Sequence, residues 1–134
     1  AAAVARRGVS VEGVPVPAAH DAETRAAVLR QVEGADLVIY ATLNAHLYPD
    51  QAALMRGLLE AQVRVIGIAV RNPYDLLAFP ALGTYLATYE YTPGAVEAAV
   101  RVMFGEVEPR GRLPVSLPGL YPRGHGLERG GRGR

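Results

Sequence analysis

Four polar side chains follow one apolar stretch of the chain and are the first candidates for chemistry. Arg71, Asn72, Tyr74 and Asp75 come directly after Val63–Val70, a run typical of a buried strand. Ligands of open α/β sheets bind outside the carboxyl ends of the strands, so this segment is placed for a polar site or a domain contact. The same residues are also typical of a turn, because Asn-Pro initiates turns and Asp stabilises them. The residue types alone favour the turn.

Two further strand ends carry polar residues, Thr42–His46 and Glu90–Thr92. With 13 carboxylates, an acid/base pair is not excluded by number. Hydrolysis of a glycoside needs two carboxyl groups about 5 Å apart, or about 6.5–9.5 Å apart in inverting enzymes. Asp75 is the one carboxylate in a loop obviously placed for such a role.

Other catalytic and ligand-binding patterns are weak. The chain has no cysteine and no lysine, and its two serines do not stand in a Gly-x-Ser-x-Gly turn. The three histidines fall in separate loops without metal-ligand spacing, and no glycine-rich loop opens a helix. We therefore predict no catalytic residue, no metal and no cofactor on this chain. The histidines are His20, His46 and His125.

Alternating apolar segments predict an α/β fold. Helical spacing and capping residues predict three helices, while apolar or alternating runs predict four strands. Helices between successive strands require parallel pairing, so we expect a three-layer α/β/α sandwich with a mostly parallel sheet and flavodoxin-like layering. The predicted helices are 22–33, 49–61 and 93–104, and the predicted strands are 9–16, 36–43, 63–70 and 85–91.

Length and composition indicate one globular domain. The chain has 134 residues, half of them hydrophobic, and a net charge of +1. A net charge this small produces no strong positive field that would attract nucleic acid, and no apolar run is long enough to span a membrane. We expect one domain over 1–127, a flexible Gly/Arg tail over 128–134 and, from the absence of cysteine, a cytoplasmic location.

The second half of the chain resembles the C-terminal domain of glycoside hydrolase family 3. Val65–Asp75 is similar to that domain's strand followed by Asn-Pro-Tyr, and Tyr91–Gly94 with Met103–Glu106 is similar to its helix and Phe-Gly. Pro109–Val115 resembles its Pro-x-Gly-[Lys/Arg]-Leu-Pro-Val signature, and Gly119–Leu127 resembles the end of the bacterial β-N-acetylhexosaminidase branch.

The resemblance implies a retaining glycosidase whose catalytic aspartate lies on an N-terminal (β/α)₈ barrel. In the β-glucosidase branch the acid/base glutamate follows the strand that matches Asp36–Thr42, but Thr42–His46 holds no carboxylate. In the hexosaminidase branch that role belongs to a histidine on a barrel loop, so no catalytic role is carried over here, not even to His46. The resemblance also implies that the domain's first strand–helix unit precedes Val9.

Two hypotheses follow. In the first, the chain is the C-terminal domain of a family 3 β-N-acetylhexosaminidase, inactive alone. It supports the barrel and borders the active-site mouth and its carbohydrate substrate, with Asn72, Tyr74 and Asp75 facing the partner domain. In the second, it is a freestanding module that binds a small anion at the strand-end loops through Arg71 and backbone amides.

Overall fold

The computed structural model describes residues 1–127, built around a three-stranded parallel sheet. The strands are β1 (Val38–Thr42), β2 (Val65–Ala69) and β3 (Tyr85–Ala87), side by side in that order. Val38 pairs with Val65 and Thr42 with Ala69, so the carboxyl ends of β1 and β2 are level. The α/β prediction is confirmed.

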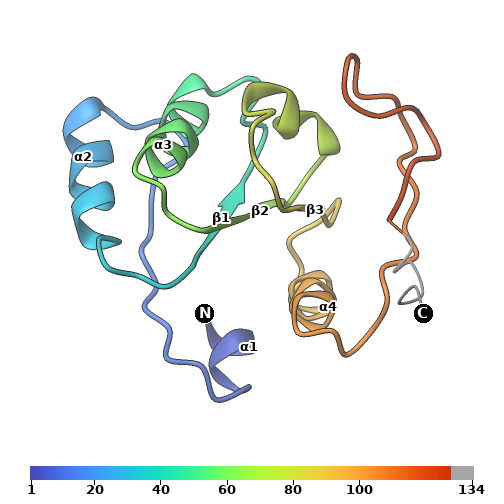
Figure 1. Cartoon of the computed structure of the whole chain (residues 1–134), viewed down its shortest axis with the longest axis horizontal. Helices are drawn as coiled ribbons and strands as arrows, with labels where there is room; N and C mark the ends of the chain where they lie inside the picture. Colours follow the sequence, from blue (N-terminus) through green and yellow to red (C-terminus); the bar gives the residue numbers. More distant parts are fainter. Residues whose placement is uncertain (128–134) are drawn as a thin grey trace.

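Helices cover both faces of the sheet. Figure 1 shows α2 (Ala22–Gln31) and α3 (Pro49–Glu60) on one side of the strands, with α1 (Ala2–Ala5) and α4 (Pro93–Met103) on the other. The predicted caps form: Asp21 accepts a hydrogen bond from the Thr24 amide, and Thr92 accepts one from Ala95. None of the helices within 1–127 is long and apolar enough to cross a membrane.

The main core lies between α3, the sheet and a 3₁₀ helix, η1 (Pro73–Ala78). Met55 and Leu82 meet over Gly67 of β2, where an added Cβ would lie 2.5 Å from a Leu82 methyl carbon. Glycine is therefore required in this strand for close packing. The buried members of this cluster are Ala45, Ala52, Met55, Leu76, Phe79, Leu82 and Leu117.

The opposite face of the sheet is less well covered. Ile39 of β1 is 37% exposed, so the prediction that Asp36–Leu43 is covered on both faces is only partly right. A small second cluster joins α1 to α4 through Val4, Val100 and Met103.

Two predicted strands differ from the structure. Residues 9–16 lie in no strand, and the alternating valines there are exposed at positions 9 and 11. Pro15 and Pro17 flank Val16 and cannot donate to a ladder, which removes this segment from the sheet. The strand predicted over 85–91 ends at Ala87, because the backbone turns at Tyr89, with φ of +63°.

The C-terminal segment returns to the core after α4. Leu117 is buried against the main core and Leu113 packs on it. Leu117 also forms an isolated antiparallel bridge with Tyr121. The segment that resembles the family signature thus anchors the end of the domain. The predicted tail, 128–134, lies outside the described residues.

Candidate functional site at the carboxyl edge of the sheet

Asp75 is the most deeply buried charged side chain of the described residues, with no exposed surface. Its two carboxylate oxygens accept one hydrogen bond each: the Thr42 hydroxyl donates at 2.7 Å and the His46 Nδ1 at 3.0 Å. A buried carboxylate is tolerated only when such donors satisfy it. The three residues form a fixed cluster, here called the Asp75 cluster.

The sheet topology brings this cluster together. Thr42 ends β1, and His46 lies in the loop that follows it. Asp75 comes after the neighbouring β2, 33 residues after Thr42 and 29 residues after His46. Asn72 caps η1 by accepting the Tyr74 amide, and Pro73 starts the helix, which turns Asp75 inward. The predicted turn over Asn72–Asp75 is therefore real, and it also supplies a buried functional group.

The hydrogen bonds fix the orientation of the His46 ring. A carboxylate only accepts, so Nδ1 of His46 carries the hydrogen and the other nitrogen, Nε2, lies on the far side of the ring. The His46 side chain is 26% exposed, and its ring packs at 5.9 Å from that of Tyr74, tilted by 58°. Nε2 is therefore the imidazole nitrogen that the cluster leaves free of Asp75, on a side chain that is partly exposed.

Two tyrosines report the charge and burial of this region. Burial and the nearby Asp75 carboxylate raise the pKa of Tyr40 and of Tyr85 well above its usual range. The Tyr85 hydroxyl donates to the Pro73 carbonyl at 3.0 Å, which ties β3 to the start of η1. Both phenols stay neutral around the buried carboxylate.

A second hydrogen bond, between Asn72 and Asn44, also joins the loop after β2 to the loop after β1. Asn72 Oδ1 accepts the Tyr74 amide, so its Nδ2 donates to Asn44 Oδ1 at 2.7 Å. This leaves Asn44 Nδ2 without a partner within 1–127 and open to solvent. Asn44 holds a φ of +56°, a left-handed conformation that asparagine tolerates better than most residues.

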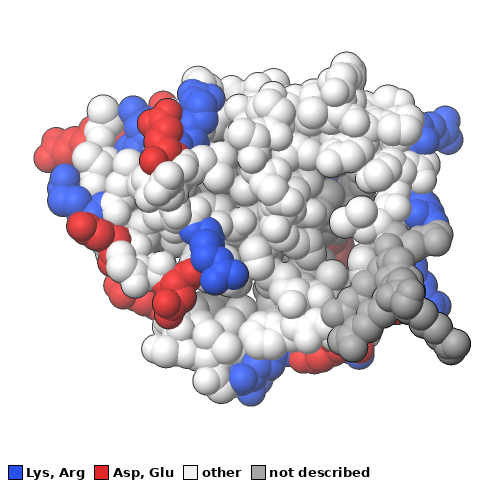
Figure 2. Space-filling model, in the orientation of Figure 1, with Lys and Arg blue, Asp and Glu red and all other residues white. Residues whose placement is uncertain are grey.

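Large apolar side chains are exposed around this edge. Leu47 is 67% exposed and Tyr48 41%, both in the loop after β1, while Tyr89 and Tyr91 after β3 are 44% and 67% exposed. Figure 2 shows most of the visible charge on the α2 side, while the surface over η1 is almost free of it. Apolar exposure in two loops at the same edge of the sheet is typical of an interaction surface.

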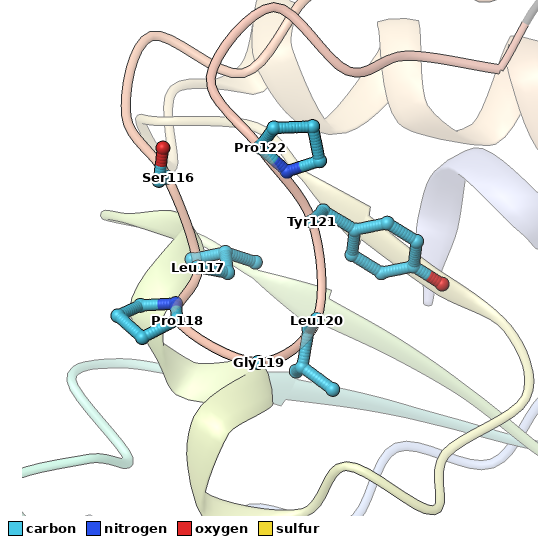
Figure 3. A pocket seen from close by; sticks show the side chains of 7 residues that line it. All are labelled: Ser116, Leu117, Pro118, Gly119, Leu120, Tyr121 and Pro122. Atoms are coloured by element: carbon cyan, nitrogen blue, oxygen red, sulfur yellow. The ribbon is translucent and has the colours of Figure 1, made fainter.

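Elsewhere in residues 1–127 we find no second group of side chains arranged for catalysis or metal binding. A hollow of about 300 Å³ lies inside the loop 116–122, where the Tyr121 phenol points away from Leu117 (Figure 3). Of its two side-chain hydroxyls, that of Ser116 accepts a hydrogen bond from the Arg123 amide and that of Tyr121 is phenolic, and no acid or base lines the hollow beside them. Within 1–127, no three metal-ligating side chains gather.

The predicted site residues are close in space but differ in exposure. Asn72 and Tyr74 are half-buried, whereas Asp75 is fully buried and can reach a partner only through His46. Arg71 is exposed, and in the described part of the chain its side chain makes no hydrogen bond to this cluster. The sequence predicted a polar strand end over Thr42–His46 but did not pair Thr42 or Asn44 with the residues that follow β2.

Two solved structures are similar to this chain. A fungal multi-domain family 3 β-N-acetylglucosaminidase, which has a GCN5-related glucosamine N-acetyltransferase region, matches 91% of this chain at 38% identity with a TM-score of 0.70. A family 3 β-N-acetylglucosaminidase from Paenibacillus sp. str. FPU-7 matches 86% of it at 31% identity with a TM-score of 0.80. Both of these solved structures are named as members of glycoside hydrolase family 3. This chain is a glycoside hydrolase family 3 domain.

The family 3 domain is a small part of these proteins. It spans 14% of the fungal chain and 22% of the Paenibacillus chain. No family model matches this sequence, and no curated protein matches it either. The resemblance of Val65–Leu127 to family 3 is confirmed by the solved structures, in which most of the chain lies outside the matched domain.

Proposed function

We propose that this chain is the C-terminal domain of a retaining family 3 β-N-acetylhexosaminidase and that it supports the catalytic barrel and borders its active-site mouth. One observation carries the proposal: large apolar side chains are exposed in two loops at the carboxyl edge, Leu47 and Tyr48 after β1 and Tyr89 and Tyr91 after β3. A companion domain that covers this edge removes that surface from water.

The family 3 neighbours support the same assignment. Both are named β-N-acetylglucosaminidases, and both contain several times more chain than this domain. In the Asp75 cluster the carboxylate is fully buried beneath His46, so the cluster has an imidazole but no exposed carboxylate that could attack a sugar. The bond-breaking groups belong to the companion domain.

The test uses the polypeptide encoded by the complete reading frame and a chromogenic N-acetyl-β-glucosaminide. Replacing Leu47 and Tyr48 together by serine is expected to lower hydrolysis at least several-fold by weakening the domain contact. Val96→Ser is the matched control, since Val96 is 42% exposed on α4 at the other face. Equal hydrolysis by the double variant and the control would overturn the proposal.

A further inference from the structure

The carboxyl edge holds two partly exposed polar side chains that the support role does not use. His46 and Asn44 lie two residues apart in the loop after β1. Each is held by a side chain that follows β2: His46 by Asp75 at 3.0 Å and Asn44 by Asn72 at 2.7 Å. The register of β1 and β2 places the loops that follow them side by side, so residues after β2 hold both side chains of the loop after β1.

The two fixed groups have complementary hydrogen-bonding character. With its hydrogen on Nδ1, a neutral His46 offers Nε2 as an acceptor, while Asn44 offers Nδ2 as a donor. Within 1–127 neither atom has a partner. A donor and an acceptor, both uncharged and both oriented before any ligand arrives, suit a neutral ligand with adjacent polar groups.

One aromatic ring packs beside His46 and a second is close to it in the sequence. The Tyr74 ring contacts the His46 ring, and the partly exposed Tyr48 follows two residues after His46. The negative face of an aromatic ring attracts the weakly positive C–H groups of a pyranose, and a few directed hydrogen bonds then fix its orientation. An anion fits less well, since Arg71 is the nearest cation in the sequence and makes no contact with the cluster.

We propose that Asn44 and His46 form a carbohydrate-binding contact for an N-acetylhexosamine unit, with Asp75 as the positioning residue that holds the His46 ring. The choice of sugar rests on the proposed function, whereas the donor–acceptor pair stands on the geometry alone. Thr42 completes the arrangement by donating to the second oxygen of Asp75, which keeps the carboxylate from rotating.

The test is an NMR titration of the ¹⁵N-labelled chain with N-acetylglucosamine and its β-1,4-linked dimer. We expect saturable shifts at residues 44–48 and 72–75, with a Kd on the order of millimolar for the dimer. Glycerol at the same concentration should cause none. Shifts that do not saturate by about 50 mM, that centre elsewhere, or that glycerol reproduces would overturn the proposal.

Two variants remove the contact without removing the fold. His46→Asn keeps an amide donor for Asp75 but lacks the outer nitrogen, and Asn44→Gly keeps the φ of +56° without strain. Each should weaken sugar binding roughly five- to tenfold, as expected for one lost hydrogen bond. His125→Ala, which removes a ring stacked on Tyr121, should leave binding unchanged. Unchanged binding in both site variants rejects the contact.

The imidazole ¹⁵N shifts test the role of Asp75 separately. In the parent chain neutral His46 should carry its hydrogen on Nδ1, and in Asp75→Asn the Nε2–H form should appear while sugar affinity falls. An Nε2–H form in the parent chain would reject the positioning role. If sugar does not bind while the Leu47/Tyr48 variant still loses hydrolysis in the full polypeptide, this inference fails and the proposed function stands.

Discussion

Ionic side chains gather in two regions of this chain that differ in their access to water. At the carboxyl edge, Asp75 is fully buried and is held by a hydroxyl and an imidazole. On the α1–α4 side, Arg7 pairs with Glu97 and Glu106 and lies 5.5 Å from the Phe104 ring. The Arg7 side chain is 15% exposed and the two glutamates 35% and 40%.

This difference in exposure separates two uses of charge. A buried carboxylate has no water to replace a lost donor. It therefore fixes the geometry of its neighbours, and the loss of one donor strongly destabilises the folded chain. In the Arg7 group the two glutamates are 35% and 40% exposed, so salt screens their charges and water can replace Arg7 as a partner, and the ion pairs add less stability. The Asp75 cluster should therefore dominate the stability of the two regions, while the Arg7 group holds α1 against α4.

The largest expected effect is that of Asp75→Ala. It leaves the buried Thr42 hydroxyl and the His46 Nδ1 without an acceptor and opens a small cavity. We expect a loss of about 3 kcal/mol in the free energy of unfolding, measured by urea denaturation. Asp75→Asn retains one acceptor and should lose less. A loss below about 1 kcal/mol for Asp75→Ala would contradict the importance of burial.

Thr42→Val should have the next largest effect. Valine has nearly the same shape but cannot donate, so one oxygen of the buried Asp75 loses its hydrogen bond. We expect a loss of about 1–2 kcal/mol in urea denaturation. Thr88→Val is the control, since the Thr88 hydroxyl donates to the Glu90 carbonyl at an exposed position. Equal losses in the two variants would refute the assignment.

Alkaline pH offers a third test of the carboxyl edge. The pKa values of Tyr40 and Tyr85 are raised in the folded chain by burial and by Asp75. The unfolded chain therefore releases these protons first, so stability is fully present below pH 10 and falls as pH rises above it. Denaturation midpoints in Tyr40→Phe and Tyr85→Phe should fall less steeply. Tyr91→Phe, at a 67% exposed position, should keep the parent slope.

The smallest effect is expected from Arg7→Ala. Hydrogen bonds from Arg7 lower the pKa of Glu97 and of Glu106 below the usual value of 4.5, so their stabilisation is present above that pH and lost as pH falls below it. The parent chain should lose this increment in high salt, and Arg7→Ala should lose less on acidification. A larger loss for Arg7→Ala than for Thr42→Val would reverse the comparison.

Much of the fold is predictable because local patterns determine it. The apolar runs and capping residues place β1, β2, α3 and α4 within two residues of the observed ends. The predictions fail where tertiary structure overrides a local pattern, as in residues 9–16, whose alternation resembles a strand but whose prolines deny it a partner. Tyr89 likewise ends β3 early by adopting a positive φ.

The candidate site is harder to predict because its contacts cross between loops. Asn72 and Asp75 stand out by their place after β2, but their partners Asn44 and His46 are 28 and 29 residues away. Whether Asp75 points outward or inward depends on the 3₁₀ turn at Pro73, which residue types alone do not determine. The parallel register of β1 and β2 was the available signal, because it sets the two loops side by side.

The most direct test of the account is a hydrolysis assay of this chain alone with a chromogenic N-acetyl-β-glucosaminide. Because the carboxylate of the Asp75 cluster is buried and the cluster offers no exposed carboxylate nucleophile beside the His46 imidazole, we predict no turnover above that of buffer. Turnover by the purified chain that His46→Asn abolishes would contradict the account, since the domain would then carry its own catalytic group.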